Sequence, residues 1–222
     1  MNSRFFRKVV DFELPPLGIY GVGFLFLPRD EKRLERSKAL VTTVVENEGG
    51  TILGWRDVPV SPDCLGEFAR NAIPSFHQIF IIFNKTEEDA IDRKLYILRK
   101  CLENGAKNLG WGMDDFYITS LSRRTIIYKG MFVSTQFSTF YPDLTDKDFK
   151  SALALVHQRY STNTFPSWPL AQPFRYIAHN GEINTLRGNI NKMQALDHTL
   201  TSPLFGSDIK KIFPVINRKK TQ

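Results

Sequence analysis

Ile19-Tyr-Gly-Val-Gly-Phe-Leu-Phe-Leu27 is the stretch around which the rest of the fold is organised. It is apolar, rich in aromatic side chains and closed by Pro28. Short apolar runs that end at a proline are typical of buried strands. The sequence therefore predicts a core strand at residues 19–27.

A helix is expected directly after this strand. Its apolar residues share one face at helical spacing, and Gly49-Gly50 marks its end. The apolar face consists of Leu34, Val41, Val44 and Val45. Extended structure is expected to resume at Thr51–Gly54, before a loop that two prolines indicate.

A second strand and helix follow in the same order. Gln78–Phe83 is strand-like, and the spacing of Thr86 to Asp89 resembles the capping pattern that opens a helix. Apolar residues at helical spacing over 91–102 continue that helix. Asn104-Gly105 is expected to end it, because both residues tolerate left-handed backbone geometry.

Two more strands, Phe116–Leu121 and Thr125–Tyr128, are expected to form a hairpin through Ser122-Arg123-Arg124. The order strand, helix, strand, strand, helix, strand over residues 19–121 is compatible with a split βαβ unit of the ferredoxin-like kind. This unit would form the first part of an α+β fold.

The second half of the chain is expected to hold shorter elements. Ala152–Val156 and Tyr176–Ala178 are short apolar strands that lead into polar sequence, and Asn184–Leu196 is expected to be a helix. Residues 217–222 are expected to be a disordered tail.

The composition is that of an ordinary globular protein. With 222 residues, of which 42% are hydrophobic, the chain can bury the core of one domain or at most two. Its longest apolar run is far shorter than the roughly 20 residues of a membrane-spanning helix, and its start lacks the apolar core of a secretory signal. Two cysteines and four widely spaced histidines indicate neither a disulfide framework nor a metal site. We expect a cytoplasmic protein that binds no membrane, with a plastid or another organelle left open.

The net charge of +7 raises the question of nucleic-acid binding, because proteins that bind phosphate backbones need dense positive patches. Lysine and arginine alternate with acidic residues over 29–38 and 85–100, which is typical of solvated helix faces. The sequence holds no zinc-finger spacing and no RNA-binding signature. We therefore expect no nucleic-acid partner and keep a basic nucleic-acid-binding module as the weakest alternative.

Two polar clusters follow the late strands, where a rigid element can aim side chains at a ligand. They are residues 157–164 and 179–184. Arg159 could grip a carboxylate with two parallel hydrogen bonds, although an arginine there is also compatible with a surface or ion-pairing role. Asn180-Gly181 could cradle an oxyanion, although the pair is also compatible with a simple turn.

These clusters lie within a longer stretch, Ala152–Asn189, that resembles the large subunit of glutamate synthases. Its most specific parts are His157-Gln-Arg-Tyr-Ser-Thr-Asn-Thr164 and His179-Asn-Gly-Glu-Ile-Asn184. Upstream segments are also similar to that family: Tyr20-Gly-Val-Gly-Phe24 with Phe26-Leu-Pro-Arg-Asp30, Leu53-Gly-Trp-Arg-Asp-Val-Pro-Val60, and Arg124-Thr-Ile-Ile-Tyr-Lys-Gly-Met131. The resemblance covers nearly the whole chain in order.

The resemblance implies a class II glutamine amidotransferase with the fold of N-terminal nucleophile hydrolases, an α/β/β/α sandwich of four layers, here incomplete. Residues 1–222 would be part of that domain, with the split βαβ portion at 19–121 and the glutamine-pocket portion at 122–216. By position, the resemblance assigns Arg159 to the carboxylate of L-glutamine and Thr162 to the pocket beside it. It assigns Asn180 and Gly181 to the oxyanion hole.

The reaction implied by the resemblance starts with an N-terminal cysteine that attacks the glutamine amide, giving glutamate and ammonia. In the full enzyme the ammonia aminates 2-oxoglutarate, with FMN, an iron-sulfur cluster and NADPH, NADH or ferredoxin supplying electrons. The implied partners are the remainder of the large subunit and a small subunit. No cofactor is expected within these 222 residues.

The catalytic cysteine is expected to lie upstream of Met1, because Tyr20-Gly-Val-Gly-Phe24 resembles a later segment of the family. Cys64 and Cys101 cannot replace it, since neither can expose a free α-amine. The aspartate-bearing segment expected after Ile216 does not appear, and Lys192 stands where the family usually has tryptophan. We therefore expect a piece of a glutamate synthase large subunit that is inactive alone. The alternative is a non-catalytic module that binds glutamine or complements a separate nucleophile segment.

Overall fold

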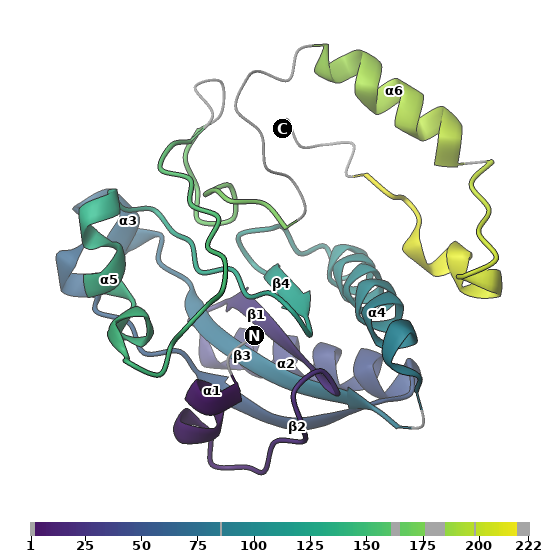
Figure 1. The fold of residues 1–222 in the computed structure, drawn as a ribbon. Helices are drawn as coiled ribbons and strands as arrows, with labels where there is room; N and C mark the ends of the chain where they lie inside the picture. Colours follow the sequence, from purple (N-terminus) through teal and green to yellow (C-terminus); the bar gives the residue numbers. More distant parts are fainter. Residues whose placement is uncertain (1–2, 85, 161–164, 176–184, 198, 217–222) are drawn as a thin grey trace.

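The computed structural model describes residues 3–84, 86–160, 165–175, 185–197 and 199–216 (Figure 1). The helices and strands in chain order are α1 (Ser3–Val9), β1 (Tyr20–Leu27), α2 (Glu31–Asn47), β2 (Gly50–Asp57), α3 (Glu67–Asn71), β3 (Ser75–Phe83), α4 (Glu88–Asn108), β4 (Tyr117–Ser122), α5 (Phe137–Phe140) and α6 (Leu186–Asp197). Short 3-10 turns lie at Pro62–Cys64, Ser134–Gln136, Pro142–Thr145 and Gly206–Ile212.

The strands form one four-stranded sheet in the order β2-β3-β1-β4, and all neighbouring strands are antiparallel. The chain passes from β1 through α2 to β2, leaving room for β3 between them. It then passes from β3 through α4 to β4, on the other side of β1. This is the topology of a split βαβ unit, as the element order over 19–121 predicts. The α+β class is confirmed, and a single sheet in the described ranges is consistent with an incomplete sandwich of the N-terminal nucleophile hydrolase type.

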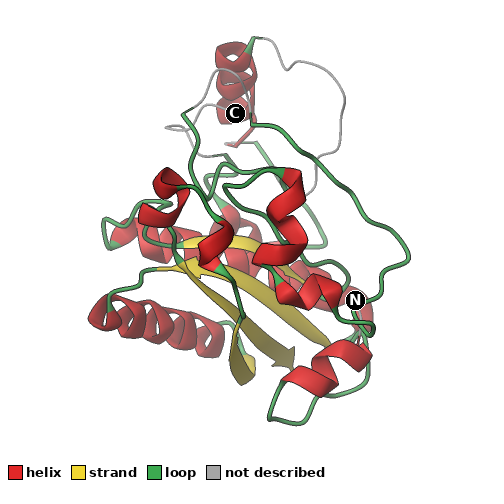
Figure 2. Cartoon of the chain, turned by 90° about the vertical axis from the view of Figure 1, so that its left-hand side faces the viewer, coloured by secondary structure: helices red, strands yellow, loops and turns green. Residues whose placement is uncertain are grey.

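Both faces of the sheet are buried, and helices lie on both sides of it (Figures 1 and 2). On one face, Leu25, Ile79 and Ile81 pack against α2 and α4. On the other face, Phe24 and Phe80 belong to two aromatic clusters, which α1 and the segment after β4 complete. Because every residue of β1 is buried, its sequence carries no polar alternation.

The ends of the two long helices differ in how well the sequence predicts them. The start of α2 is fixed by the Asp30 side chain, which accepts a hydrogen bond from the Arg33 backbone N–H at 3.0 Å. Gly49, at φ +74°, supplies the left-handed residue after α2, so the predicted end at Gly49-Gly50 is confirmed. The capping pattern at Thr86 is wrong, because its hydroxyl donates to the Asn84 carbonyl instead.

The predicted end of α4 at Asn104-Gly105 is also wrong, since the helix continues to Asn108. Gly105 lies inside the helix, where a Cβ would stand only 3.1 Å from Leu40 of α2. The glycine therefore serves close helix packing, and Gly110 at φ +77° is the left-handed residue instead.

Thr125–Tyr128 does not form the predicted hairpin strand. Side chains of β4 satisfy the backbone groups that a strand partner would need: Thr119 Oγ1 donates to the Ile127 carbonyl, and Ser120 Oγ accepts from the Ile127 N–H. The distances are 3.1 and 3.2 Å. The segment is therefore held to the sheet by side chains rather than by a backbone ladder.

The predicted strand Ala152–Val156 is wrong as well, because its residues have no strand assignment. Leu153, Leu155 and Val156 are 80%, 53% and 68% exposed. A strand exists only where a neighbouring strand takes its hydrogen bonds, and none of the described strands lies beside this segment. The predicted strand Tyr176–Ala178 and the predicted tail 217–222 fall outside the described residues.

His77 of β3 gives the fold an expected dependence on pH. It is buried, its Nε2 lies 2.8 Å from Ser75 Oγ, and its Nδ1 lies 2.7 Å from Asp57 Oδ1 without the alignment of a hydrogen bond. Burial and the nearby Lys38 ammonium lower the pKa of His77 below its ordinary value of 6.5, while Asp57 acts in the opposite direction. Below pH 6.5 the unfolded chain therefore binds more protons than the folded one, so the free energy of unfolding should fall as the pH drops.

Urea unfolding at a series of pH values from 8 to 5 tests this expectation. The His77→Gln variant should lose part of the acid destabilisation that the wild type shows below about pH 6.5. The matched control His157→Gln, which replaces an exposed histidine, should keep it. An unchanged pH dependence in His77→Gln would show that the destabilisation comes from other groups.

Candidate functional site

Arg159 lies on a cavity of about 260 Å³ that three segments of the chain enclose. The cavity is lined by residues 128–137 on one wall, 155–160 on a second and 171–173 on a third. The lining residues are Tyr128, Lys129, Gly130, Phe132, Ser134, Phe137, Leu155, Val156, His157, Gln158, Arg159, Tyr160, Ala171, Gln172 and Pro173. We refer to this space as the Arg159 cavity.

The charge of the Arg159 cavity suits an anionic group. Its described lining contains no aspartate or glutamate, and Arg159 is its exposed basic residue. Arg159 is exposed, and its backbone N–H donates to His157 Nδ1 at 3.1 Å. An exposed guanidinium beside a cavity without carboxylates can accept a carboxylate from solution.

The other predicted site residues, Thr162, Asn180 and Gly181, lie outside the described residues. Their placement beside Arg159 therefore stays a prediction.

Aromatic residues pack behind Gly130 and Phe132 of the Arg159 cavity. Trp168 is buried against Phe76 and Phe140, with ring centroids 5.4 and 5.6 Å apart, and its indole N–H donates to the Ala69 carbonyl at 3.1 Å. A Cβ on Gly130 would overlap the rings of Phe132 and Trp168. Only glycine at this position lets the backbone approach the rings so closely.

A buried polar network lies beneath Tyr128. The Arg56 guanidinium donates to both Asp143 carboxylate oxygens, at 2.6 and 2.8 Å, and to Gln78 Oε1 at 2.9 Å. Tyr128 Oη donates to Asp143 Oδ2 at 2.7 Å and accepts from Gln78 Nε2 at 3.0 Å. Burial and the Asp143 carboxylate hold the pKa of Tyr128 well above its ordinary value, so the phenol stays a neutral donor. The network therefore holds in place the side chain of Tyr128, which is one of the residues that line the cavity.

Sequence analysis missed Tyr128, Lys129 and Tyr160 as cavity residues. Tyr128-Lys129 interrupts the otherwise apolar run from Ile126 to Met131. A lysine within such a run indicates a buried charge with a specific task, and that signal could have identified the segment.

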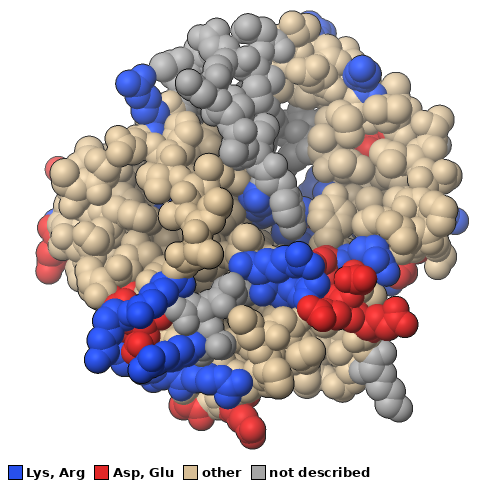
Figure 3. Space-filling model, in the orientation of Figure 1, with Lys and Arg blue, Asp and Glu red and all other residues tan. Residues whose placement is uncertain are grey.

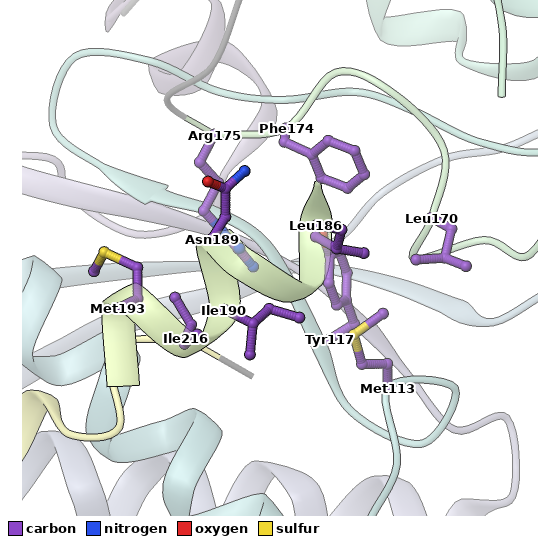
Figure 4. Close-up of a pocket in the computed structure, with 10 residues that line it drawn as sticks. All are labelled: Met113, Tyr117, Leu170, Phe174, Arg175, Leu186, Asn189, Ile190, Met193 and Ile216. Atoms are coloured by element: carbon purple, nitrogen blue, oxygen red, sulfur yellow. The ribbon is translucent and has the colours of Figure 1, made fainter. Parts of the chain in front are cut away.

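A second cavity, of about 350 Å³, lies between β4 and α6 (Figure 4). It is lined by Met113, Tyr117, Leu170, Phe174, Arg175, Leu186, Asn189, Ile190, Met193 and Ile216. Arg175 is the single charged residue in this lining, and its Nη2 lies 3.4 Å from Glu103 Oε1. Because apolar side chains of α6 form most of one wall, this cavity is where α6 meets the body of the molecule.

Neither cysteine has the surroundings of a nucleophile. Burial and the Glu48 carboxylate raise the pKa of Cys101 to about 11. Cys64 Sγ donates to the Ser61 carbonyl at 3.1 Å. A reactive thiol needs a lowered pKa or an adjacent base, so the raised pKa of Cys101 argues against a nucleophilic role for it.

Several basic side chains on the surface pair with acidic ones. In the lower half of the face seen in Figure 3, groups of lysine and arginine adjoin aspartate and glutamate, and a larger basic group lies at the lower left. Arg33 pairs with Asp115, and Arg123 pairs with Glu88 and Asp92. This pattern does not favour the nucleic-acid-binding alternative, which needs an unpaired basic surface.

Two further features of the described residues bear on function. Among them, no three histidine, cysteine, aspartate or glutamate side chains gather closely enough to hold a metal ion. None of the helices in the described ranges has the length and hydropathy to cross a membrane.

Comparison with known proteins places the whole chain in one family. A family profile described as glutamine amidotransferases class-II matches residues 1–222. The chain is 45% identical over 221 residues to the glutamate synthase (NADPH) large chain of Bacillus subtilis (strain 168), covering 97% of this chain. It is 47% identical over 195 residues to the chloroplastic ferredoxin-dependent glutamate synthase of Oryza sativa subsp. japonica, covering 87% of this chain.

A third relative is the glutamate synthase (NADH) of Saccharomyces cerevisiae, which is 40% identical over 229 residues and covers 96% of this chain. The chain spans only 14%, 12% and 10% of the length of these three relatives. The matches are thus nearly complete for the chain and partial for the relatives. The chain belongs to the class-II glutamine amidotransferase family.

Proposed function

We propose that these 222 residues supply the glutamine-binding part of a glutamine amidotransferase, in which Arg159 holds the α-carboxylate of L-glutamine. The observation that carries the proposal is the position of Arg159 on a cavity whose described lining holds no acidic side chain. The cavity, at about 260 Å³, is slightly smaller than pockets for drug-sized ligands, which run from about 300 to 1,000 Å³. That size suits one amino acid.

The remaining roles in this proposal come from the position of residues in the family's motifs. Thr162 would line the pocket beside Arg159. Asn180 and Gly181 would offer a side-chain amide and a backbone N–H to the oxyanion that forms when the glutamine amide is attacked. Residues 19–121 would serve as the split βαβ scaffold, and 122–216 as the glutamine-pocket portion.

For the whole protein we propose a glutamate synthase large subunit. Glutamine would be hydrolysed to glutamate and ammonia, and the ammonia would aminate 2-oxoglutarate reductively. The named relatives are NADPH-, NADH- and ferredoxin-dependent glutamate synthases, which supports one of these three as electron donor. The partners would be the remainder of the large subunit and a small subunit, in the cytoplasm or, as in the rice relative, in a chloroplast.

An iron-sulfur cluster does not fit this chain's own residues. Iron-sulfur clusters are held by cysteine thiolates, typically four, whereas the chain has two cysteines, which lie on separate elements. We therefore assign the cluster to another part of the whole protein.

Isothermal titration calorimetry of the 222-residue chain with L-glutamine tests the proposal. Arg159→Ala should weaken glutamine binding about 10- to 100-fold, because hydrogen bonds to a charged group contribute roughly 1.5–3 kcal/mol. The matched control Arg36→Ala removes an exposed arginine of α2 and should leave the affinity unchanged.

A ligand control isolates the carboxylate. 4-Aminobutanamide, which is glutamine without its α-carboxylate, should bind wild type and Arg159→Ala equally weakly. Absence of glutamine binding by the wild type would refute the glutamine-binding role of this chain. Equal glutamine affinity in wild type and Arg159→Ala would refute the role of Arg159.

The second candidate function is complementation of a separately supplied nucleophile segment. The raised pKa of Cys101 favours it. Under this alternative the chain alone would bind glutamine and release no ammonia.

A further inference from the structure

Lys129 is the most deeply buried basic residue of the described chain, with only 2% of its surface exposed. Its backbone belongs to the first wall of the Arg159 cavity. Its side chain reaches away from this wall to residues on either side of the third wall, 171–173. Lys129 therefore lines one wall of the cavity and contacts the residues that flank another.

The Lys129 ammonium contacts one residue before the third wall and one residue after it. Nζ donates to the Pro169 carbonyl at 2.8 Å, and it lies 4.9 Å from the centroid of the Phe174 ring. Pro169 precedes the lining residues 171–173 and Phe174 follows them. Nζ is also anchored to β4, because it donates to Tyr117 Oη at 2.9 Å and lies 4.5 Å from that ring.

The second wall is held to the backbone at Gly130, the residue that follows Lys129. Tyr160 Oη lies 3.4 Å from the Gly130 carbonyl and 3.2 Å from the Ser167 carbonyl, toward which it donates. Tyr160 is the chain neighbour of Arg159, so this contact limits where Arg159 can stand. The Lys129 carbonyl is itself held by Tyr141 Oη at 2.9 Å.

Stability alone does not account for a lysine at this position. None of the ion pairs among the described residues includes Lys129, so its charge is buried without a carboxylate. Burial, together with the Arg175 guanidinium, lowers the pKa of Lys129 well below its ordinary value. Burying a charge without an opposite charge has a desolvation cost that no Coulomb attraction to a carboxylate offsets.

We propose that Lys129 is a positioning residue, whose side chain holds the third wall of the Arg159 cavity at the distance that the bound ligand requires. The identification of that ligand as glutamine rests on the function proposed above. Residues that hold a site in its binding geometry raise affinity by reducing the ordering cost of binding. Lys129 does this from behind the wall, through Pro169, Phe174 and Tyr117.

The experiment compares Lys129→Met with a matched control, Lys100→Met. Methionine keeps the length of the side chain and removes its donors. Lys100 is also a buried lysine whose Nζ donates to a proline carbonyl, that of Pro214 at 2.7 Å, but it lies in α4 outside the Arg159 cavity. Three quantities are measured in each variant: the urea unfolding midpoint, glutamine affinity by calorimetry, and amide hydrogen exchange without ligand.

Lys129→Met should weaken glutamine binding roughly tenfold, as expected for the loss of one or two hydrogen bonds that position the wall. It should also raise the exchange rates of the Leu170 and Ala171 amides, which donate to Ser167 and Trp168. Its unfolding midpoint should be no lower than that of the wild type. Lys100→Met should change neither the affinity nor these two exchange rates.

Two outcomes would overturn the proposal. One is wild-type affinity and wild-type exchange in Lys129→Met. The other is a lower unfolding midpoint with faster exchange throughout the chain, which would show a general structural role. If the wild type does not bind glutamine, the proposed function fails, and the exchange of Leu170 and Ala171 still decides the role of Lys129.

Discussion

Replacing Asp143 by alanine is expected to lower the free energy of unfolding by about 3–5 kcal/mol, the cost of leaving a buried charge without its partner. The Arg56 and Asp143 side chains are 8% and 4% exposed and are joined by two hydrogen bonds of 2.6 and 2.8 Å. Without Asp143, the Arg56 guanidinium stays buried and Tyr128 loses the acceptor of its hydroxyl proton. Urea unfolding of wild type and variant measures the difference.

Two control variants separate this buried pair from an ordinary ion pair. Asp146→Ala breaks the pair that Asp146 forms with the half-exposed Lys8 at 2.6 Å, and it should lower the free energy of unfolding far less than Asp143→Ala does. The double variant Arg56→Met/Asp143→Leu should be more stable than Asp143→Ala, because it removes both charges. A cost for Asp143→Ala equal to that of Asp146→Ala would contradict the assignment of Arg56–Asp143 as a buried charge network.

Replacing Phe80 by alanine is also expected to lower the free energy of unfolding by about 3–5 kcal/mol, because it opens a cavity in a fully buried cluster. Phe80 is 0% exposed, and its ring centroid lies 5.2 Å from that of Phe6, 5.3 Å from that of Phe12 and 6.2 Å from that of Tyr20. Phe6 belongs to α1, so the variant removes the main aromatic contact between α1 and the sheet. Urea unfolding measures the stability.

Trypsin cleavage under native conditions gives a second reading of Phe80→Ala. Cleavage after Arg7 and Lys8 of α1 should become faster, because the helix loses its contact with the sheet. Phe68→Ala is the matched control: Phe68 is 56% exposed, so both its stability and its cleavage rate should stay close to wild type, within about 0.5 kcal/mol. Unchanged cleavage of α1 in Phe80→Ala would show that other contacts hold the helix.

The split βαβ sheet could be predicted because its signals are local. Each strand from β1 to β4 carries an apolar run of its own, and α2 and α4 carry an apolar face at helical spacing. By contrast, α1 was missed, because its phenylalanines pack on residues far along the chain, Phe6 on Phe80 and Phe5 on Phe149. Thr125–Tyr128 was misread for a related reason, since the partners of its backbone are side chains of Thr119 and Ser120.

The candidate site likewise contains residues that the sequence identified and residues that it did not. Arg159 was identified from its place after an apolar run and from the family motif, and the structure puts it on a cavity. The strand that was expected to carry it did not form, because no neighbouring strand takes its hydrogen bonds within the described residues. Lys129 and Tyr160 were not identified, since their importance depends on which segments they tie together.

The sequence by itself determined the family, the α+β class and the order of strands and helices over residues 19–121, and it predicts Arg159 as a site residue. These properties follow from motifs and from hydrophobic periodicity, which act over a few residues to a few tens of residues. Only the tertiary structure decided where α1 packs, how Arg56 and Asp143 pair, and which three segments enclose the Arg159 cavity. Those contacts join residues as far apart as Arg56 and Asp143, which are 87 positions apart, and no local pattern records which distant groups will meet when the core is packed.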